Sequence, residues 1–274
     1  GEHISDLVDS RTGVPMFSLY GGTYKPTEAM MNEVDVVVVD IQDIGVRYYT
    51  FMWTMTHVLE ACAQYDVEML ILDRPNPLGA MRAGPILDSS ISTLVGRFPV
   101  PVAHGLTIGE IAQLVNSEWL EKSATVSVIA CEYYQRSMFW QDTELPYWIA
   151  PSPNMPRLET INHYIGSCLI EGTNLSEGRG TTHPFEIIGA PWINRHQLAD
   201  ELNRTILNQY SPYIVARPHS FQPTISKYEG EVCHGIQLHT SDKMPNPSLF
   251  AIWLDIIDTI RKLYPEEFDW IQIG

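Results

Sequence analysis

An uninterrupted run of four valines between two aspartates is the feature that most restricts the fold of this chain. The run occupies residues 35–40 (DVVVVD), and a second apolar run follows at residues 67–72 (VEMLIL). Continuous β-branched runs of this length are typical of strands that are buried on both faces of a parallel sheet. We therefore expect residues 35–40 to form such a strand, with both of its faces covered.

Helical patterns separate the strand-like runs. From Arg47 to about residue 66, apolar side chains recur at steps of three and four, as expected for a helix with one buried face. Thr107 and Glu110 form a capping box that predicts a second helix to about residue 120, and residues 14–20 and 126–130 are strand-like. Strands that alternate with helices predict an α/β fold with a Rossmann-like, doubly wound parallel sheet.

Four prolines within residues 146–156 interrupt this alternation. We expect a domain boundary there, with a Rossmann-like domain at residues 1–148 and a smaller α+β domain at residues 149–274. In the second domain the sequence predicts a helix at 195–208, a strand at 233–239 and an amphipathic helix at 249–263. The apolar face expected for the last helix consists of Phe250, Trp253, Leu254, Ile257 and Ile260.

Composition excludes several classes of protein. The 17 basic and 33 acidic residues give a net charge of −16, which argues against a nucleic-acid partner. No apolar run approaches the roughly 18 residues that a membrane-spanning helix needs. The four cysteines form no C-x-x-C pair and the nine histidines form no zinc-binding motif, so the sequence indicates neither a metal nor a cofactor.

Polar side chains follow the predicted strands of the first domain. Residues 40–49 (DIQDIGVRYY) and 73–79 (DRPNPLG) come directly after strands, and His104 precedes the capping box. Because ligands of parallel sheets bind at the carboxyl ends of the strands, we expect a site there. The alternatives are structural: Asp43 could cap the following helix, Asp73 and Arg74 could form a local ion pair, and His104 could hold a loop.

In the second domain, residues 171–182 (EGTNLSEGRGTT) combine carboxylates, an arginine and hydroxyl groups with three glycines. The segment matches neither a P-loop nor a dinucleotide-binding fingerprint. Carboxylates beside amide and hydroxyl donors suit a polyhydroxylated ligand such as a sugar. A tight polar loop that connects domains is the alternative.

Long motifs of this chain resemble one bacterial family, formerly described as a domain of unknown function and now associated with NamZ-type exo-β-N-acetylmuramidases. The resemblance rests on DIQDIGVRYYT, LDRPNPLGA, PSPNMP and LIEGTNLSEGRGTTHPFEIIGAPW, and on AHGLTIGE within residues 84–110. It implies a Rossmann-like domain, a smaller C-terminal domain and an active site in a cleft between them. It also implies removal of terminal N-acetylmuramic acid from the non-reducing ends of peptidoglycan fragments.

The resemblance gives the polar residues roles as expectations. The catalytic carboxyls would come from Asp40, Asp43 and Glu177, and a guanidinium of Arg47, Arg74 or Arg179 would bind the lactyl carboxylate. The remaining residues expected to bind substrate are Gln42, Tyr49, Asp73, Asn76, His104, Asn154, Glu171, Asn174 and Thr181. These segments should converge, with a carboxyl of Asp40 or Asp43 within about 12 Å of Glu177 or Arg179.

Longer relatives of this family carry an upstream Pro-Glu-His-Gly motif whose glutamate is the expected catalytic carboxyl, and Glu2-His3 does not match that motif. A protein that binds muramyl saccharides without cleaving them is therefore the alternative function. An enzyme acting on nucleotides is a remoter one, because the glycine fingerprint is absent. The expected partners are peptidoglycan-derived muramyl saccharides. Such substrates predict a periplasmic or secreted protein, whereas four unpaired cysteines suit the reducing cytoplasm.

Overall fold

The computed structural model describes residues 6–241 and 249–271, and the chain divides into two compact units. Unit 1 is Gly1–Leu145 and unit 2 is Pro146–Gly274. The elements of unit 1 are β1 (Leu7–Val8), β2 (Pro15–Met16), α1 (Glu28–Met31), β3 (Val36–Val39), α2 (Phe51–Tyr65), β4 (Glu68–Leu72), η1 (Ser89–Ile91), α3 (Ile108–Glu118), β5 (Val126–Ile129) and η2 (Trp140–Asp142). Those of unit 2 are α4 (Leu158–Ser167), η3 (Cys168–Gly172), β6 (Ile187–Ala190), α5 (Arg195–Arg204), η4 (Leu207–Tyr210), β7 (Ile214–Phe221), β8 (Cys233–Thr240) and α6 (Leu249–Leu263).

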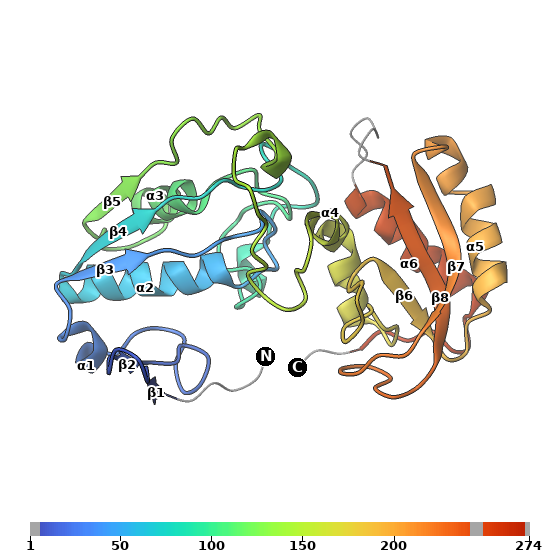
Figure 1. Cartoon of the computed structure of the whole chain (residues 1–274), viewed down its shortest axis with the longest axis horizontal. Coiled ribbons are helices and arrows are strands. Elements are labelled where there is room, and N and C mark those ends of the chain that lie inside the picture. Colours follow the sequence, from blue (N-terminus) through green and yellow to red (C-terminus); the bar gives the residue numbers. More distant parts are fainter. Residues whose placement is uncertain (1–5, 242–248, 272–274) are drawn as a thin grey trace. The chain divides into compact units, whose positions relative to one another are not determined.

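The main sheet of unit 1 is parallel, with β4 between β3 and β5 (Figure 1). Because side chains alternate along a strand, Val39, Met69 and Ile71 point to one face, where they join a core formed by the apolar sides of α2 and α3. Both helices therefore cover the same face. The parallel α/β arrangement predicted for the first half of the sequence is confirmed.

The opposite face of this sheet is open. Val36, Val38 and Ile129 are 41%, 54% and 56% exposed. The prediction that residues 35–40 form a strand with both faces covered is therefore wrong. β3 lies at an edge, and consecutive right-handed crossovers in one direction place α2 and α3 on the same side of the sheet.

Two predicted boundaries in unit 1 shift for identifiable reasons. α2 begins at Phe51 and not at Arg47, because the amide of Arg47 donates to the carbonyl of Val102 at 2.7 Å and Val46 bridges to Ala103. The strand expected at 14–20 shrinks to β2, whose exposed residues pair only with the equally short β1. The capping box of α3 is present as predicted.

Unit 2 is built on an antiparallel sheet in which β8 lies between β6 and β7 (Figure 1). Its core joins one face of this sheet to the buried sides of α5 and α6, and α4 packs against α6. Leu254 of α6 was expected on the apolar face but is 43% exposed, because the buried stripe runs through Ile252, Trp253, Ile256, Ile257 and Ile260. The sequence analysis also missed α4, β6 and β7.

No helix within the described part of the chain is both long and apolar enough to cross a membrane.

The buried imidazole of His163 in α4 makes the stability of the protein depend on pH. Nδ1 has no hydrogen-bond partner, and the ring packs edge-on against Trp253. Burial lowers the pKa of His163 from its ordinary value of 6.5 to about 4. Above about pH 6.5 the ring is neutral in both states. As the pH falls from 6.5 to 4, the unfolded chain binds a proton that the folded chain does not.

We therefore expect the free energy of unfolding to decrease between pH 6.5 and 4, with His163 contributing on the order of 3 kcal/mol. Urea unfolding at several pH values checks this. The His163→Gln variant should lose most of this dependence, whereas replacement of the exposed His196 by Gln should keep it. An unchanged slope in His163→Gln would contradict the assignment.

Candidate functional site

Three polar segments of unit 1 meet at the carboxyl edge of the parallel sheet. Gln42, which follows β3, donates from Nε2 to the carbonyl of Pro75 at 3.0 Å. Asn76, which follows β4, donates to the carbonyl of Leu106 at 3.0 Å. Gly45 has a φ of +78°, and a Cβ atom at this position would collide with the side chain of Asn76. The three segments therefore form one connected set of loops, as their positions after the strands predicted.

The carboxylate of Asp40 is held by Arg74. Arg74 donates to the same oxygen of Asp40 from Nε at 2.9 Å and from Nη2 at 2.6 Å. The two side chains are 51% and 42% exposed. This pair is open to solvent, and both groups lie at the surface of the loop edge.

Asp73 binds the start of α3. One oxygen accepts from the hydroxyl of Thr107 at 2.7 Å and the other accepts from the amide of Gly109 at 2.9 Å. An anion at a helix N-terminus is stabilised by the unpaired amides and the helix dipole. Because both oxygens of Asp73 are occupied, this residue holds the loop after β4 to the helix.

Asp43 and His104 form a buried pair. Oδ2 of Asp43 accepts from the amide of Gly45 at 2.7 Å and lies 3.4 Å from Nε2 of His104. Nδ1 of His104 accepts from the amide of Leu106 at 3.2 Å, so the proton of the neutral ring lies on Nε2 and faces the carboxylate. Oδ1 of Asp43 is buried without a hydrogen-bond partner. It is therefore the carboxylate oxygen of this site with unused capacity to bind a donor.

His104 also lines a pocket of about 310 Å³ together with Arg82 and Arg136. Arg136 donates to the carbonyl of Gly105 at 2.7 Å and forms an ion pair with Glu110. Arg82 is exposed. Because Glu110 offsets the charge of Arg136, the exposed guanidinium of Arg82 is the group of this pocket that suits an anion. Arg82 and Arg136 were not predicted from the sequence, because neither directly follows a predicted strand or belongs to a recognisable motif.

Arg47 and Tyr49 are part of the interior. Arg47 is 6% exposed and donates from Nη1 to the carbonyls of Pro85 and Val100 at 2.8 and 2.6 Å. Burial lowers the pKa of Arg47 from its ordinary value. The Tyr49 ring is buried and packs against Phe51. Arg47 thus joins two loops. Its contact with a substrate carboxylate stays a prediction, and the burial of the Arg47 side chain does not favour it.

The segment at 171–182 forms an ion cluster in unit 2. Glu177 is 2% exposed and lies between Arg179 at 3.3 Å and Lys227 at 3.0 Å. Arg179 also donates from Nε to Glu171 at 2.8 Å. Burial opposes the charge of Arg179, but the carboxylates of Glu171 and Glu177 outweigh it and raise its pKa.

This cluster is explained by local charge balance, with two carboxylates facing two cations. Lys227, which the sequence analysis missed, also donates to the carbonyls of Ile170 and Thr173 at 2.9 Å each. The catalytic role expected for Glu177 stays a prediction, and the enclosure of its carboxylate does not favour it.

Three further predicted residues of unit 2 lie in turns. Asn174 donates to the carbonyl of Glu267 and accepts from the amide of Asp269, which ties the segment to the C-terminal part of the chain. Thr181 donates to the carbonyl of Gly178 at 2.6 Å. Asn154 is half-buried in the turn before α4. Their roles in binding, and the expected convergence of these residues with those of unit 1, stay predictions.

A polar group on the antiparallel sheet of unit 2 was not anticipated. Arg217, His219 and His239 point to the face of the antiparallel sheet opposite α5 and α6. Partial burial and the charge of Arg217 lower the pKa values of both histidines. This group was not predicted, because the strand β7 that contains Arg217 and His219 was not expected from the sequence.

Within residues 6–241 and 249–271, no group of three or more His, Cys, Asp or Glu side chains is arranged to hold a metal ion.

We expect Asp73 and Asp40 to differ in their effect on stability, although both carboxylates follow strands of the same sheet. Asp73→Asn should lower the free energy of unfolding by about 1–2 kcal/mol, because the charge at the start of α3 is lost. Asp40→Asn should cost less than about 0.5 kcal/mol, because its ion pair is exposed. Urea unfolding of both variants at pH 7 checks this, and equal losses would contradict the structural role of Asp73.

Known proteins resemble this chain along its whole length. The peptidoglycan β-N-acetylmuramidase NamZ of Bacillus subtilis is 44% identical over 275 aligned residues, which cover 100% of this chain and 65% of that protein. The chain thus spans about two thirds of the length of this relative. Two crystal structures of DUF1343-family proteins of Bacteroides fragilis match 94% and 95% of the chain, and 67% of each of those chains. Their sequence identities are 36% and 37%, and their TM-scores are 0.85 and 0.71.

Two family models account for nearly every residue. The N-terminal domain of the exo-β-N-acetylmuramidase NamZ matches residues 1–159, and its C-terminal domain matches residues 162–273. The resemblance that the sequence motifs indicated is confirmed. The chain belongs to the NamZ exo-β-N-acetylmuramidase family.

Proposed function

We propose that this chain carries the activity of a glycoside hydrolase that releases terminal N-acetylmuramic acid from the non-reducing ends of peptidoglycan fragments. The observation that carries the proposal is the 44% identity, across the whole chain, to a peptidoglycan β-N-acetylmuramidase. Because the chain spans 65% of that relative, the activity of the longer protein is transferred to this chain only as a proposal.

The loop edge of unit 1 offers the chemistry that such a reaction needs. Glycosidases use carboxyl groups to move protons and to stabilise positive charge at the sugar. In our proposal Asp43 is the carboxyl that acts on the substrate, because its Oδ1 is buried and has no hydrogen-bond partner. His104 is proposed as a positioning residue, because its Nε2 lies 3.4 Å from the other oxygen, which also accepts from the amide of Gly45.

Asp40 is the second carboxyl in this proposal. It follows β3 only three residues before Asp43, and its side chain is half exposed. Its partner Arg74 keeps the carboxylate in place at the rim while Asp43 lies inside. One buried and one solvated carboxyl is a common division of roles in glycosidases.

The lactyl carboxylate of muramic acid distinguishes this sugar from N-acetylglucosamine. In our proposal Arg82 binds this carboxylate at the mouth of the pocket that His104 and Arg136 also line. Arg136 is already bonded to Gly105 and Glu110, whereas Arg82 is exposed. This assignment replaces Arg47, Arg74 and Arg179, whose guanidinium groups are engaged by other partners. A substrate of this kind supports a periplasmic or secreted location.

A chromogenic N-acetylmuramide tests the activity. The chain, and a longer polypeptide with the additional segments of the Bacillus subtilis relative, should release the chromophore. Asp43→Asn should lower kcat by about 100-fold or more, because the amide cannot exchange a proton. The control is Asp66→Asn, which alters an exposed ion pair with Lys122 at the end of α2.

Failure of both polypeptides to release the chromophore would overturn the hydrolase assignment. Calorimetry with muropeptides then separates the alternative function, since a binding protein would give heat of binding without turnover. Equal activities of Asp43→Asn and Asp66→Asn would leave the reaction in place but remove Asp43 from it.

Arg82 gives a second, independent prediction. Arg82→Gln should raise KM for the N-acetylmuramide by about tenfold and change kcat little, because a carboxylate remote from the reacting bond is bound equally in the ground and transition states. Steady-state kinetics checks this, with Arg204→Gln as the control because Arg204 is exposed in α5. An unchanged KM would show that the carboxylate is bound elsewhere.

A further inference from the structure

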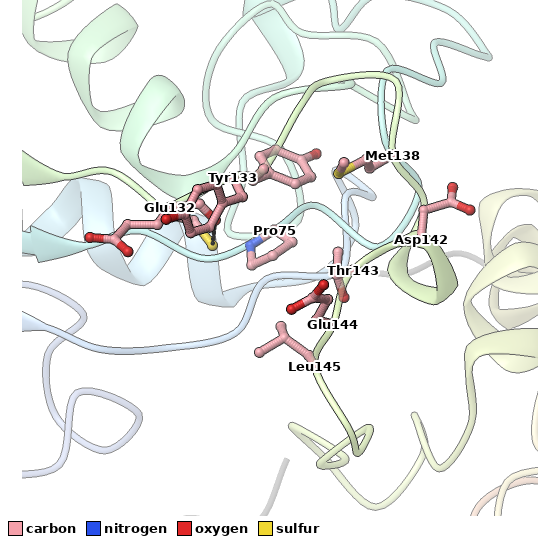
Figure 2. A pocket seen from close by; sticks show the side chains of 10 residues that line it. Pro75, Glu132, Tyr133, Met138, Asp142, Thr143, Glu144 and Leu145 are labelled. Atoms are coloured by element: carbon pink, nitrogen blue, oxygen red, sulfur yellow. Dashed lines mark hydrogen bonds between the residues drawn. The ribbon is translucent and has the colours of Figure 1, made fainter.

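A second pocket of about 480 Å³ lies beside the candidate site, and all of its lining residues belong to unit 1 (Figure 2). Its lining comes from Pro75 after β4 and from the stretch of chain that follows β5, up to Leu145. The pocket is therefore at the same carboxyl edge of the sheet as Asp40 and Asp43. Its volume is within the range of small-ligand sites.

Pro75 connects this pocket with the candidate site. Its carbonyl accepts from Gln42 at 3.0 Å, and its ring lies in the middle of the side chains that line the pocket (Figure 2). Tyr134 is a further lining residue, and burial raises the pKa of its phenol above the ordinary value. A ligand in the pocket would therefore lie beside Pro75, whose carbonyl is bonded to Gln42, the residue before Asp43.

The surfaces of the pocket have the chemistry of a sugar-binding site. Tyr133 is 91% exposed and has a φ of +61°, so that its ring stands out from the chain beside Pro75 (Figure 2). An exposed aromatic ring gives a flat apolar surface on which the C–H face of a pyranose can stack. Glu132 and Glu144 are exposed carboxylates that can accept hydrogen bonds from sugar hydroxyls.

The charge of the pocket restricts which sugar can bind. Three carboxylates line it, those of Glu132, Asp142 and Glu144, and no Lys, Arg or His is among its lining residues. Such a pocket repels an anion, so it favours a neutral sugar over a sugar that carries a carboxylate. It thus differs from the pocket of Arg82 and His104, which suits a carboxylate.

We infer that the pocket lined by Tyr133 and Glu144 binds an uncharged sugar unit of the substrate, next to the terminal muramyl residue. The identity of this sugar as the neighbour of muramic acid rests on the proposed function. Binding of a neutral sugar at Tyr133 is a property of the pocket alone. The two neighbouring pockets would then bind different sugars of the substrate. The pocket of Arg82 would take the sugar with a carboxylate, and the pocket of Tyr133 would take the uncharged sugar.

The test is calorimetric titration of the full chain with N,N′-diacetylchitobiose, a neutral probe, and separately with N-acetylmuramic acid. Tyr133→Ala should weaken chitobiose binding by about tenfold, because the stacking surface is lost. Tyr147→Ala is the matched control, since Tyr147 is 77% exposed and does not line the pocket. Neither exposed tyrosine supports the core, so both variants should fold.

A charge variant gives a readout that a structural role would not produce. In the double variant Glu132→Gln and Glu144→Gln, the affinity for N-acetylmuramic acid relative to chitobiose should rise by about fivefold, because the repulsion of the lactyl carboxylate is reduced. Absence of chitobiose binding, or equal weakening by Tyr133→Ala and Tyr147→Ala, would overturn the inference. Preference for the cationic glucosamine dimer over chitobiose would also overturn it, since the ligand would then be an amine.

These outcomes are separate from those of the proposed function. Loss of N-acetylmuramide hydrolysis leaves chitobiose binding measurable, and it would remove only the statement that the bound sugar neighbours muramic acid. Conversely, an active hydrolase whose chitobiose binding ignores Tyr133 would refute the pocket and leave the activity intact.

Discussion

The carboxylate of Asp73 at the start of α3 is the interaction on which the loop edge of unit 1 depends. It joins the end of β4 to Thr107 and Gly109, and thereby sets the position of the loop that contains Pro75 and Asn76. A Cβ atom on Gly109 would collide with Val128 and approach Asp73 closely, so helix, strand and loop meet at this point without spare room. Pro75 and Asn76 in turn contact Gln42 and Leu106. Removal of this anchor would affect the loops that line both pockets described above, those of Tyr133 and of Arg82.

Two segments with similar composition have different environments in the structure. Residues 40–49 and residues 171–182 both combine carboxylates with arginine and hydroxyl groups. In the first, Asp43 retains a buried oxygen without a partner, which costs free energy unless a ligand or water supplies a donor. In the second, Glu177 is enclosed by Arg179 and Lys227, so the burial cost of each charge is offset by its neighbours. The two carboxylates therefore differ in their charged neighbours: Glu177 lies against two cations, whereas Asp43 lies beside one imidazole.

Features with local causes could be predicted from the sequence. The capping box of α3 depends on Thr107 and Glu110 alone, and the apolar stripe of α2 depends on helical spacing. The gathering of Asp43, Asn76 and His104 followed from the rule that strand ends of a parallel sheet share one edge. The open face of β3 could not be predicted, because a valine run looks the same whether helices cover one face of a sheet or both. The ion partner Lys227 and the guanidinium of Arg82 were missed because folding alone brings them to these sites.

The packing of α6 against α4 has a consequence for the order in which the units can fold during synthesis. The strands and helices of the parallel sheet in unit 1 follow one another along the chain, so this unit can complete its core as soon as β5 has emerged. Unit 2 cannot, because Trp253 and its neighbours in α6 complete a core that begins with Ile170. The side chain of Asn174 likewise can form its hydrogen bonds only after Glu267 and Asp269 have been synthesised. The second unit therefore cannot complete its core until α6 has left the ribosome, and its apolar surface stays exposed until then.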